Sequence, residues 1–319
     1  MPGTRDRAAA HGQPVPPGVE YTGILRGAQA GLARALAGVF AALLSFMVFV
    51  PFGTQAFVWL GWQAVGHPGE FAAYYRSAVA FERPEGMLAV HLGLGLLIPI
   101  SLGLAYFIHG VAPRWFVSVQ PGMRWRYLLL ASGLAVVVLN GVLLASRAGQ
   151  PWDARPQDNF VAFVAVILIS SPIQAAAEEF FFRGYLLTAL GSMVKSHWFG
   201  IVTSALVFAL FHGVQNVPLF LDRFGFGLLA GVLAVATGGL EAGIAAHVIN
   251  NICAFLYAAI FSTVAKVKAT QELGWIDALF DLGGFAIYTI GAIWLARKLD
   301  LARTTPALAT GLRPTGKVQ

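Results

Sequence analysis

The chain has 319 residues, of which 57% are hydrophobic and 11% charged, and its mean hydropathy is +0.70. A soluble domain carries about 25% charged residues, so this composition excludes an ordinary soluble protein and indicates an integral membrane protein. The net charge of +6 is spread over short loops and tails, without the clustered basic stripe that nucleic-acid binding requires.

The expected elements are apolar runs separated by short polar segments. The first 20 residues are rich in Pro, Gly and Ala, and they predict a disordered cytoplasmic tail that extends to residue 30. Eight apolar runs follow, at Ala35–Leu60, Met87–Ile108, Tyr127–Ala145, Phe160–Leu190, Phe199–Val214, Phe224–Thr237, Leu240–Phe261 and Ile276–Ala296. Residues 31–297 therefore read as one bundle of about eight transmembrane helices, and residues 298–319 as a cytoplasmic C-terminal tail.

The fourth run is longer than the roughly 20 residues that one span needs. We expect it to cross the membrane, emerge near Glu178 and continue as an interfacial helix to about Gly191. The only cysteine, Cys253, lies inside the seventh run, so no intrachain disulfide and no cysteine zinc site can form.

Positive charge orients the predicted spans, because Lys and Arg accumulate in cytoplasmic segments. The segments that carry most of it are the two ends, the loop between spans two and three, and the loop between spans four and five. Both termini, Glu178 and Arg183 are therefore predicted on the cytoplasmic side. The Gly, Ala and Arg content is typical of a bacterial chain, which places this multi-pass protein in the cytoplasmic membrane.

Charged residues interrupt the fourth run, where Glu178 and Glu179 are followed by three phenylalanines and Arg183. A charge in a membrane span costs about 2.5–3.5 kcal/mol, so such residues usually face a polar interior and have a function. Glu179 and Arg183 are four residues apart and can pair along one helix face, which leaves Glu178 free to face other polar groups. Taken alone, the segment fits equally well a helix end with solvated charges.

Two later runs add polar residues at helical spacing. Phe208 and His212 lie one turn apart in the fifth run, and His247 and Asn251 lie one turn apart in the seventh. A single membrane histidine or asparagine is more often an interhelical hydrogen-bond partner than a catalytic group. The joint occurrence of acid, base and amide groups on three helices favours an active site.

The three motifs, EExxxR at 178–183, FxxxH at 208–212 and HxxxN at 247–251, resemble the CPBP family of intramembrane glutamic endopeptidases, which includes the CAAX and bacteriocin-processing proteases. The resemblance covers a motif core at residues 160–261 within the domain 31–297. It implies an all-α bundle of about eight transmembrane helices with a polar cavity open toward the cytoplasmic side. It also implies hydrolysis of a peptide bond in a membrane-associated or lipidated peptide, with the bilayer as the other partner and no nucleic acid.

The resemblance assigns roles to residues that chemistry can support. Glu178 is expected to be the general base for a water, and His212 to hold that water or protonate the leaving amine. His247 and Asn251 are expected to donate hydrogen bonds to the oxyanion. Supporting roles are expected for Glu179, Arg183 and Phe208: the first two hold the helix in register, Arg183 could also attract a substrate carboxylate, and Phe208 packs behind the site. Phe180, Phe181 and Phe182 are expected to face lipid or line the entrance.

Alternatives stay open at this point. No cofactor is expected, but Glu178, His212 and His247 are also zinc ligand types, so a metal-activated water is an alternative. A proton-coupled transporter and an inactive scaffold would use the same residues as a relay or as interhelical contacts, although no internal repeat of the transporter kind is present. No zinc-protease HExxH motif, rhomboid-type serine motif or pair of mid-span aspartates is present. The substrate, and whether it is prenylated, does not follow from the sequence.

Overall fold

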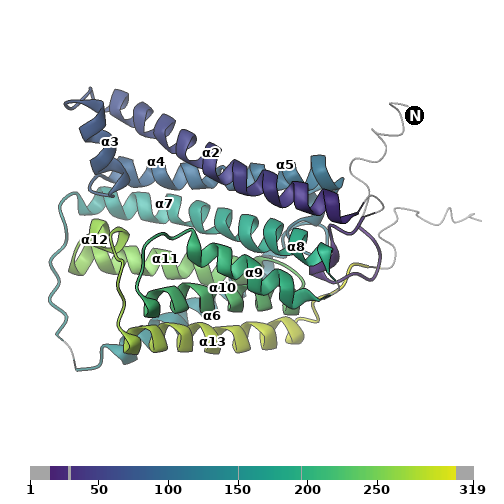
Figure 1. Cartoon of the computed structure of the whole chain (residues 1–319). Coiled ribbons are helices and arrows are strands. Elements are labelled where there is room, and N and C mark those ends of the chain that lie inside the picture. The colour runs from purple at the N-terminus through teal and green to yellow at the C-terminus, as the bar shows by residue number, and fades with distance from the viewer. Residues whose placement is uncertain (1–14, 28–29, 150, 195, 307–319) are drawn as a thin grey trace, which may run out of the picture.

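The computed structural model describes residues 15–27, 30–149, 151–194 and 196–306, and these residues form an all-α bundle (Figure 1). They contain no β-strand, only the isolated bridges Glu20–Thr304 and Ser118–Gly239. The helices are η1 (Tyr21–Gly23), α2 (Leu32–Ala64), α3 (Phe71–Val79), α4 (Pro84–Gly95), α5 (Leu97–His109), η2 (Pro113–Trp115), α6 (Trp125–Ser146), α7 (Phe160–Glu178), η3 (Glu179–Leu186), α8 (Leu187–Met193), α9 (His197–Leu210), α10 (Val217–Thr237), α11 (Glu241–Phe261), α12 (Val264–Lys268) and α13 (Trp275–Lys298).

Seven stretches of the described chain are long and apolar enough to cross a membrane. They are α2, the joined α4 and α5 (Pro84–His109), α6, the continuous α7–η3–α8 (Phe160–Met193), α10, α11 and α13. The predicted class, an all-α integral membrane bundle, is confirmed. The predicted span at Phe199–Val214 corresponds to α9, which has 14 residues and so extends about 21 Å, short of the ~30 Å hydrocarbon core.

The helix α7 runs through the middle of the bundle and packs against α4 on one side and α11 on the other. Figure 1 shows α2, α4 and α5 on one side of α7, and α10, α6 and α13 on the other. Residues 177–191 are buried on every face of the helix. The predicted interfacial helix after Glu178 is therefore wrong: a helix enclosed on all sides by other helices lies inside the bundle rather than on its surface.

The two ends of the described chain pack against each other at one end of the bundle (Figure 1). The Thr305 amide donates to the Val19 carbonyl at 2.9 Å, and the Thr305 hydroxyl donates to the Pro16 carbonyl at 2.5 Å. Tyr21 and Ile24 are fully buried. The predicted disordered tail 1–30 is thus corrected for residues 15–27, which are packed. Residues 1–14 and 307–319 of the two predicted tails lie outside the described residues.

Candidate active site

Glu179 and Arg183 form the predicted ion pair, deep inside the bundle. Arg183 Nη1 donates to Glu179 Oε1 at 2.9 Å, and the two side chains are 1% and 0% exposed. The guanidinium lies over the ring of Phe208, 4.4 Å from its centroid, and over Phe226 at 5.2 Å. Phe208 therefore packs against the guanidinium, and it also lines the cavity described below. Arg183 is enclosed, so the suggestion that it attracts a substrate carboxylate is wrong.

The three phenylalanines between these charges are also buried. Phe180, Phe181 and Phe182 are 8%, 0% and 2% exposed. None of them faces lipid, which was one of the two expected positions. Phe182 lines the cavity described below, which fits the other half of the prediction. Residues 179–186 form a π-helix, a wider turn that occurs frequently at functional sites.

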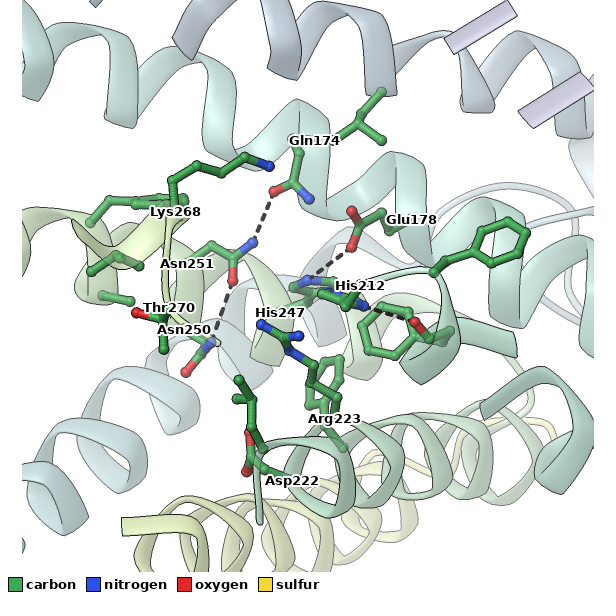
Figure 2. Close-up of a pocket in the computed structure, with 18 of the residues that line it drawn as sticks. Gln174, Glu178, His212, Asp222, Arg223, His247, Asn250, Asn251, Lys268 and Thr270 are labelled. Carbon is green, nitrogen blue, oxygen red and sulfur yellow. Dashed lines mark hydrogen bonds and ion pairs between the residues drawn. The ribbon is translucent and has the colours of Figure 1, made fainter. Parts of the chain in front are cut away.

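Both glutamates contact one imidazole, that of His247 on α11. Its Nδ1 lies 2.9 Å from Glu179 Oε1, and its Nε2 lies 3.5 Å from Glu178 Oε2 (Figure 2). Glu179 is already paired with Arg183 and accepts hydrogen bonds only, so Nδ1 of His247 carries the proton of that bond. Glu179 therefore orients the ring, and Nε2 is the nitrogen turned toward Glu178.

His212 follows α9 and faces the same cavity. Its Nδ1 lies 2.7 Å from the Phe208 carbonyl oxygen, so Nδ1 donates and Nε2 remains available. The helix stops at Leu210, and Gly213 adopts φ +80°, a left-handed conformation that ends the turn. Burial lowers the pKa of His212, while the negative charge of Glu178 raises it.

Asn251 lies one turn after His247, and sequence analysis missed its partner. Its Nδ2 donates to Gln174 Oε1 at 2.9 Å, and Asn250 Nδ2 donates to Asn251 Oδ1 at 3.3 Å (Figure 2). Gln174 lies four residues before Glu178, on the same helix face. That spacing was visible in the sequence and could have identified it.

The cavity between these helices has a volume of about 570 Å³. Glu178, His212, His247 and Asn251 all line it, so the structure brings together the four predicted catalytic residues. Its apolar wall comes from α2, α4, α9, α10 and α11, and polar residues that sequence analysis did not single out also line it: His91, Gln174, Asp222, Arg223, Asn250, Lys268, Thr270 and Gln271.

The cavity opens at the end of the bundle where α3 and α12 lie. Its lining includes Phe81, Val214 and Lys268 through Gln271, which belong to the connections at that end. Figure 1 shows this end opposite the one where α2 begins and α13 ends. Cytoplasmic termini and a cytoplasmic mouth, both predicted from the sequence, therefore cannot hold together.

The same geometry bears on the zinc alternative. The two nitrogens of His247 face Glu179 and Glu178, and Nδ1 of His212 is used by a backbone carbonyl. Among the described residues, no group of three His, Cys, Asp or Glu side chains converges in a way that could hold a metal ion. The donor set as arranged does not fit a metal site.

Comparison with known proteins adds to this geometry. A model of the family described as Type II CAAX prenyl endopeptidase Rce1-like matches residues 160–253. The chain is also similar to the uncharacterized protein YyaK of Bacillus subtilis strain 168, with 32% identity over 203 residues, which cover 58% of this chain and 67% of YyaK. The chain belongs to the Rce1-like CAAX protease family. The resemblance predicted from the three motifs is thus confirmed.

Membership in the Rce1-like family makes this a multi-pass membrane protein of a CAAX-type intramembrane protease family. The matched segment contains Gln174, Glu178, His212, Arg223 and His247 but ends before Lys268. The similarity to YyaK agrees with the predicted bacterial origin.

Proposed function

We propose that this Rce1-like protein is an intramembrane endopeptidase in which Glu178 activates a water for attack on a peptide bond. One observation carries the proposal: of the two adjacent glutamates, Glu179 is taken up by Arg183, whereas Glu178 lines the cavity with no cation other than the His247 imidazole beside it. A carboxylate at a cavity wall is placed to accept a proton from a water bound there.

In this mechanism Glu178 takes a proton from the water, and the resulting hydroxide attacks the carbonyl carbon of the scissile bond. The C–N bond then breaks as the leaving amine receives a proton. His212 assists both steps: its Nε2 first accepts a hydrogen bond from the water, and later takes the proton from Glu178 and passes it to the amine.

The developing oxyanion takes hydrogen bonds from His247 and Asn251. Glu179 accepts the hydrogen bond of Nδ1 of His247, so Nε2 is the ring nitrogen turned toward the cavity and donates to the oxyanion when it carries a proton. Asn251 gives one amide hydrogen to Gln174 and keeps the second for the oxyanion. Loss of one such donor typically lowers the rate about 10²–10³-fold.

The substrate is a membrane-associated or lipidated peptide that enters from the bilayer. Phe46, Val90, Leu94 and Phe255 give the cavity an apolar wall, and about 570 Å³ is typical of a small-ligand site and accommodates a short stretch of extended chain. The bilayer itself is the second partner, and nucleic acid has no role.

The test is cleavage by purified protein of a library of lipidated and unlipidated membrane-anchored peptides, with and without chelator. Wild type is compared with Glu178→Ala and with Glu272→Ala, a matched control whose carboxylate is exposed and does not line the cavity. We expect cleavage that Glu178→Ala abolishes, that Glu272→Ala retains and that the chelator leaves unchanged.

Two results contradict this proposal. Chelator-sensitive cleavage would replace the glutamate-activated water with a metal-activated one. If the wild type is folded but cleaves no peptide, and so does not differ from Glu178→Ala, the transporter or scaffold interpretation is favoured instead.

A further inference from the structure

Two cations line the cavity without a carboxylate partner. Arg223 lies in the second turn of α10, and Lys268 is the last residue of α12. Arg223 Nη1 donates to the neutral side chain of Gln215 at 2.8 Å, and Lys268 Nζ lies 5.2 Å from the centre of the Phe81 ring. In the described part of the chain, neither cation has an acidic oxygen within ion-pair distance.

The buried arginines elsewhere in the bundle behave differently. Arg183 pairs with Glu179, and Arg124 pairs with both oxygens of Glu241, at 2.8 and 2.5 Å. A charge in a membrane protein interior is costly unless it is paired, and unpaired ones mark ligand or ion pathways. Arg223 is half-buried and Lys268 is exposed where they line the cavity, so both cations are accessible to an anion that enters it.

Asp222, the neighbour of Arg223, does not neutralise this pair. Adjacent helix residues project about 100° apart. In Figure 2, Arg223 extends toward His212 and His247, and Asp222 lies on the far side of Arg223 from them. Asp222 and Arg223 act on each other through their charges, but among the described residues their side chains form no ion pair, and Asp222 also feels the charge of Asp281 on α13.

The amine of Lys268 lies near the mouth of the cavity and also experiences the negative charge of Glu178 at the inner end. Burial lowers the pKa of its amine, the negative charge of Glu178 raises it, and the positive charge of Arg223 lowers it again. The two cations and Glu178 therefore act on one common space, with Glu178 at its inner end and Lys268 near the mouth.

We propose that Arg223 and Lys268 together bind an anionic group of the substrate, a carboxylate or a phosphate, while its scissile bond lies at Glu178. The inference rests on the proposed function, because it places the substrate in the same cavity. Guanidinium and ammonium groups are the usual protein partners of both anions. Arg223 lies inside the segment that matches the family model, and Lys268 lies outside it.

The test measures binding, so that it does not depend on turnover. In a Glu178→Gln background in neutral-lipid nanodiscs, a fluorescent apolar hexapeptide with a free C-terminal carboxylate is compared with its C-terminal amide. We expect the acid to bind about tenfold more tightly than the amide, as one charge-assisted hydrogen bond provides. Arg223→Gln and Lys268→Gln should each remove most of that preference, and Arg223→Lys should restore part of it.

Lys266→Gln is the matched control, because Lys266 lies on α12 two residues from Lys268 and does not line the cavity. It should keep the preference for the acid. In a second arm, phosphatidylglycerol replaces the neutral lipid. If this lipid weakens peptide binding when Arg223 and Lys268 are both present, and no longer does so in Arg223→Gln or Lys268→Gln, the bound anion is a lipid phosphate.

The proposal is overturned if acid and amide bind equally and phosphatidylglycerol has no effect, or if the preference survives both Gln substitutions. Neither result touches the role of Glu178, which the cleavage assay tests separately. Conversely, loss of the proposed protease function would leave a measured anion preference intact.

Discussion

Two adjacent glutamates have different tasks in this protein. Glu179 Oε1 accepts hydrogen bonds from both Arg183 and His247, each at 2.9 Å, and its side chain is fully buried. Glu178 meets only the far nitrogen of the same imidazole, at 3.5 Å, and lines the cavity. Their neutral variants should therefore fail in different ways.

We expect Glu179→Gln to lower the free energy of unfolding by about 3–5 kcal/mol, because it leaves the Arg183 guanidinium buried without its counter-charge. Glu178→Gln should abolish cleavage and leave the unfolding midpoint within a few degrees of wild type. Thermal unfolding in one detergent, together with the peptide assay, measures both. A stable Glu179→Gln protein, or an active Glu178→Gln protein, would refute the division of roles.

At the scale of the element, two departures from a regular α-helix build the site. The π-helix η3 follows Glu178 directly, and its wider turn accompanies the convergence of both glutamates on His247. The helix α9 ends at Leu210, so His212 follows the helix and is exposed to the cavity that it lines. The spacing of residues along a regular helix predicts neither feature.

Gly243 on α11 shows how closely η3 is packed. A Cβ atom at this position would lie 2.9 Å from Glu179 Oε2. We expect Gly243→Ala to lower stability by about 1–3 kcal/mol and to reduce cleavage, since the displaced Glu179 carboxylate no longer orients His247.

The control is Gly133→Ala on α6, where a Cβ would meet no atom within 4 Å. Alanine is the better helix former by up to about 1 kcal/mol, so this variant should be as stable as wild type or slightly more so. The unfolding midpoints and cleavage rates of Gly243→Ala and Gly133→Ala, each compared with wild type, test this prediction. Equal behaviour of the two alanine variants would mean that the packing against Glu179 is unimportant.

At the scale of the whole molecule, the arrangement of the helices links the membrane side of the chain ends to the membrane side of the cavity mouth. The start of α2 and the end of α13 lie at one end of the bundle (Figure 1), and the lining of the cavity reaches the other end at Phe81, Val214 and Lys268. The distribution of Lys and Arg predicts cytoplasmic termini. If that holds, the mouth faces away from the cytoplasm, and the substrate is a segment presented on the outer side of the membrane.

Cysteine labelling tests this orientation in a Cys253→Ala background. Single cysteines are introduced as Glu272→Cys, in the connection at the mouth end, and Arg303→Cys, at the end with the termini; both positions are exposed. We expect a membrane-impermeant maleimide added to intact spheroplasts to label Glu272→Cys and to label Arg303→Cys only after lysis. The reverse pattern would show cytoplasmic mouth and external termini, against the charge pattern.

The sequence by itself determined the class of protein and the identities of the proposed catalytic residues. Apolar runs of span length follow from the cost of exposing a polar backbone to lipid, so composition alone reveals a helical bundle. Charged and amide residues are equally conspicuous in such runs because each is costly there. Glu178, His212, His247 and Asn251 could thus be selected, and the pairing of Glu179 with Arg183 follows from helical spacing.

Only the tertiary structure decided what surrounds these residues. Arg223 and Lys268 reach the cavity because α10 and α12 both border it, and contacts between distant segments leave no local pattern in the chain. The burial of Arg183 and of residues 177–191, the packed segment 15–27 and the position of the mouth depend on the same contacts. Hydropathy shows that a helix avoids water, but it does not distinguish lipid from protein as the surroundings of that helix.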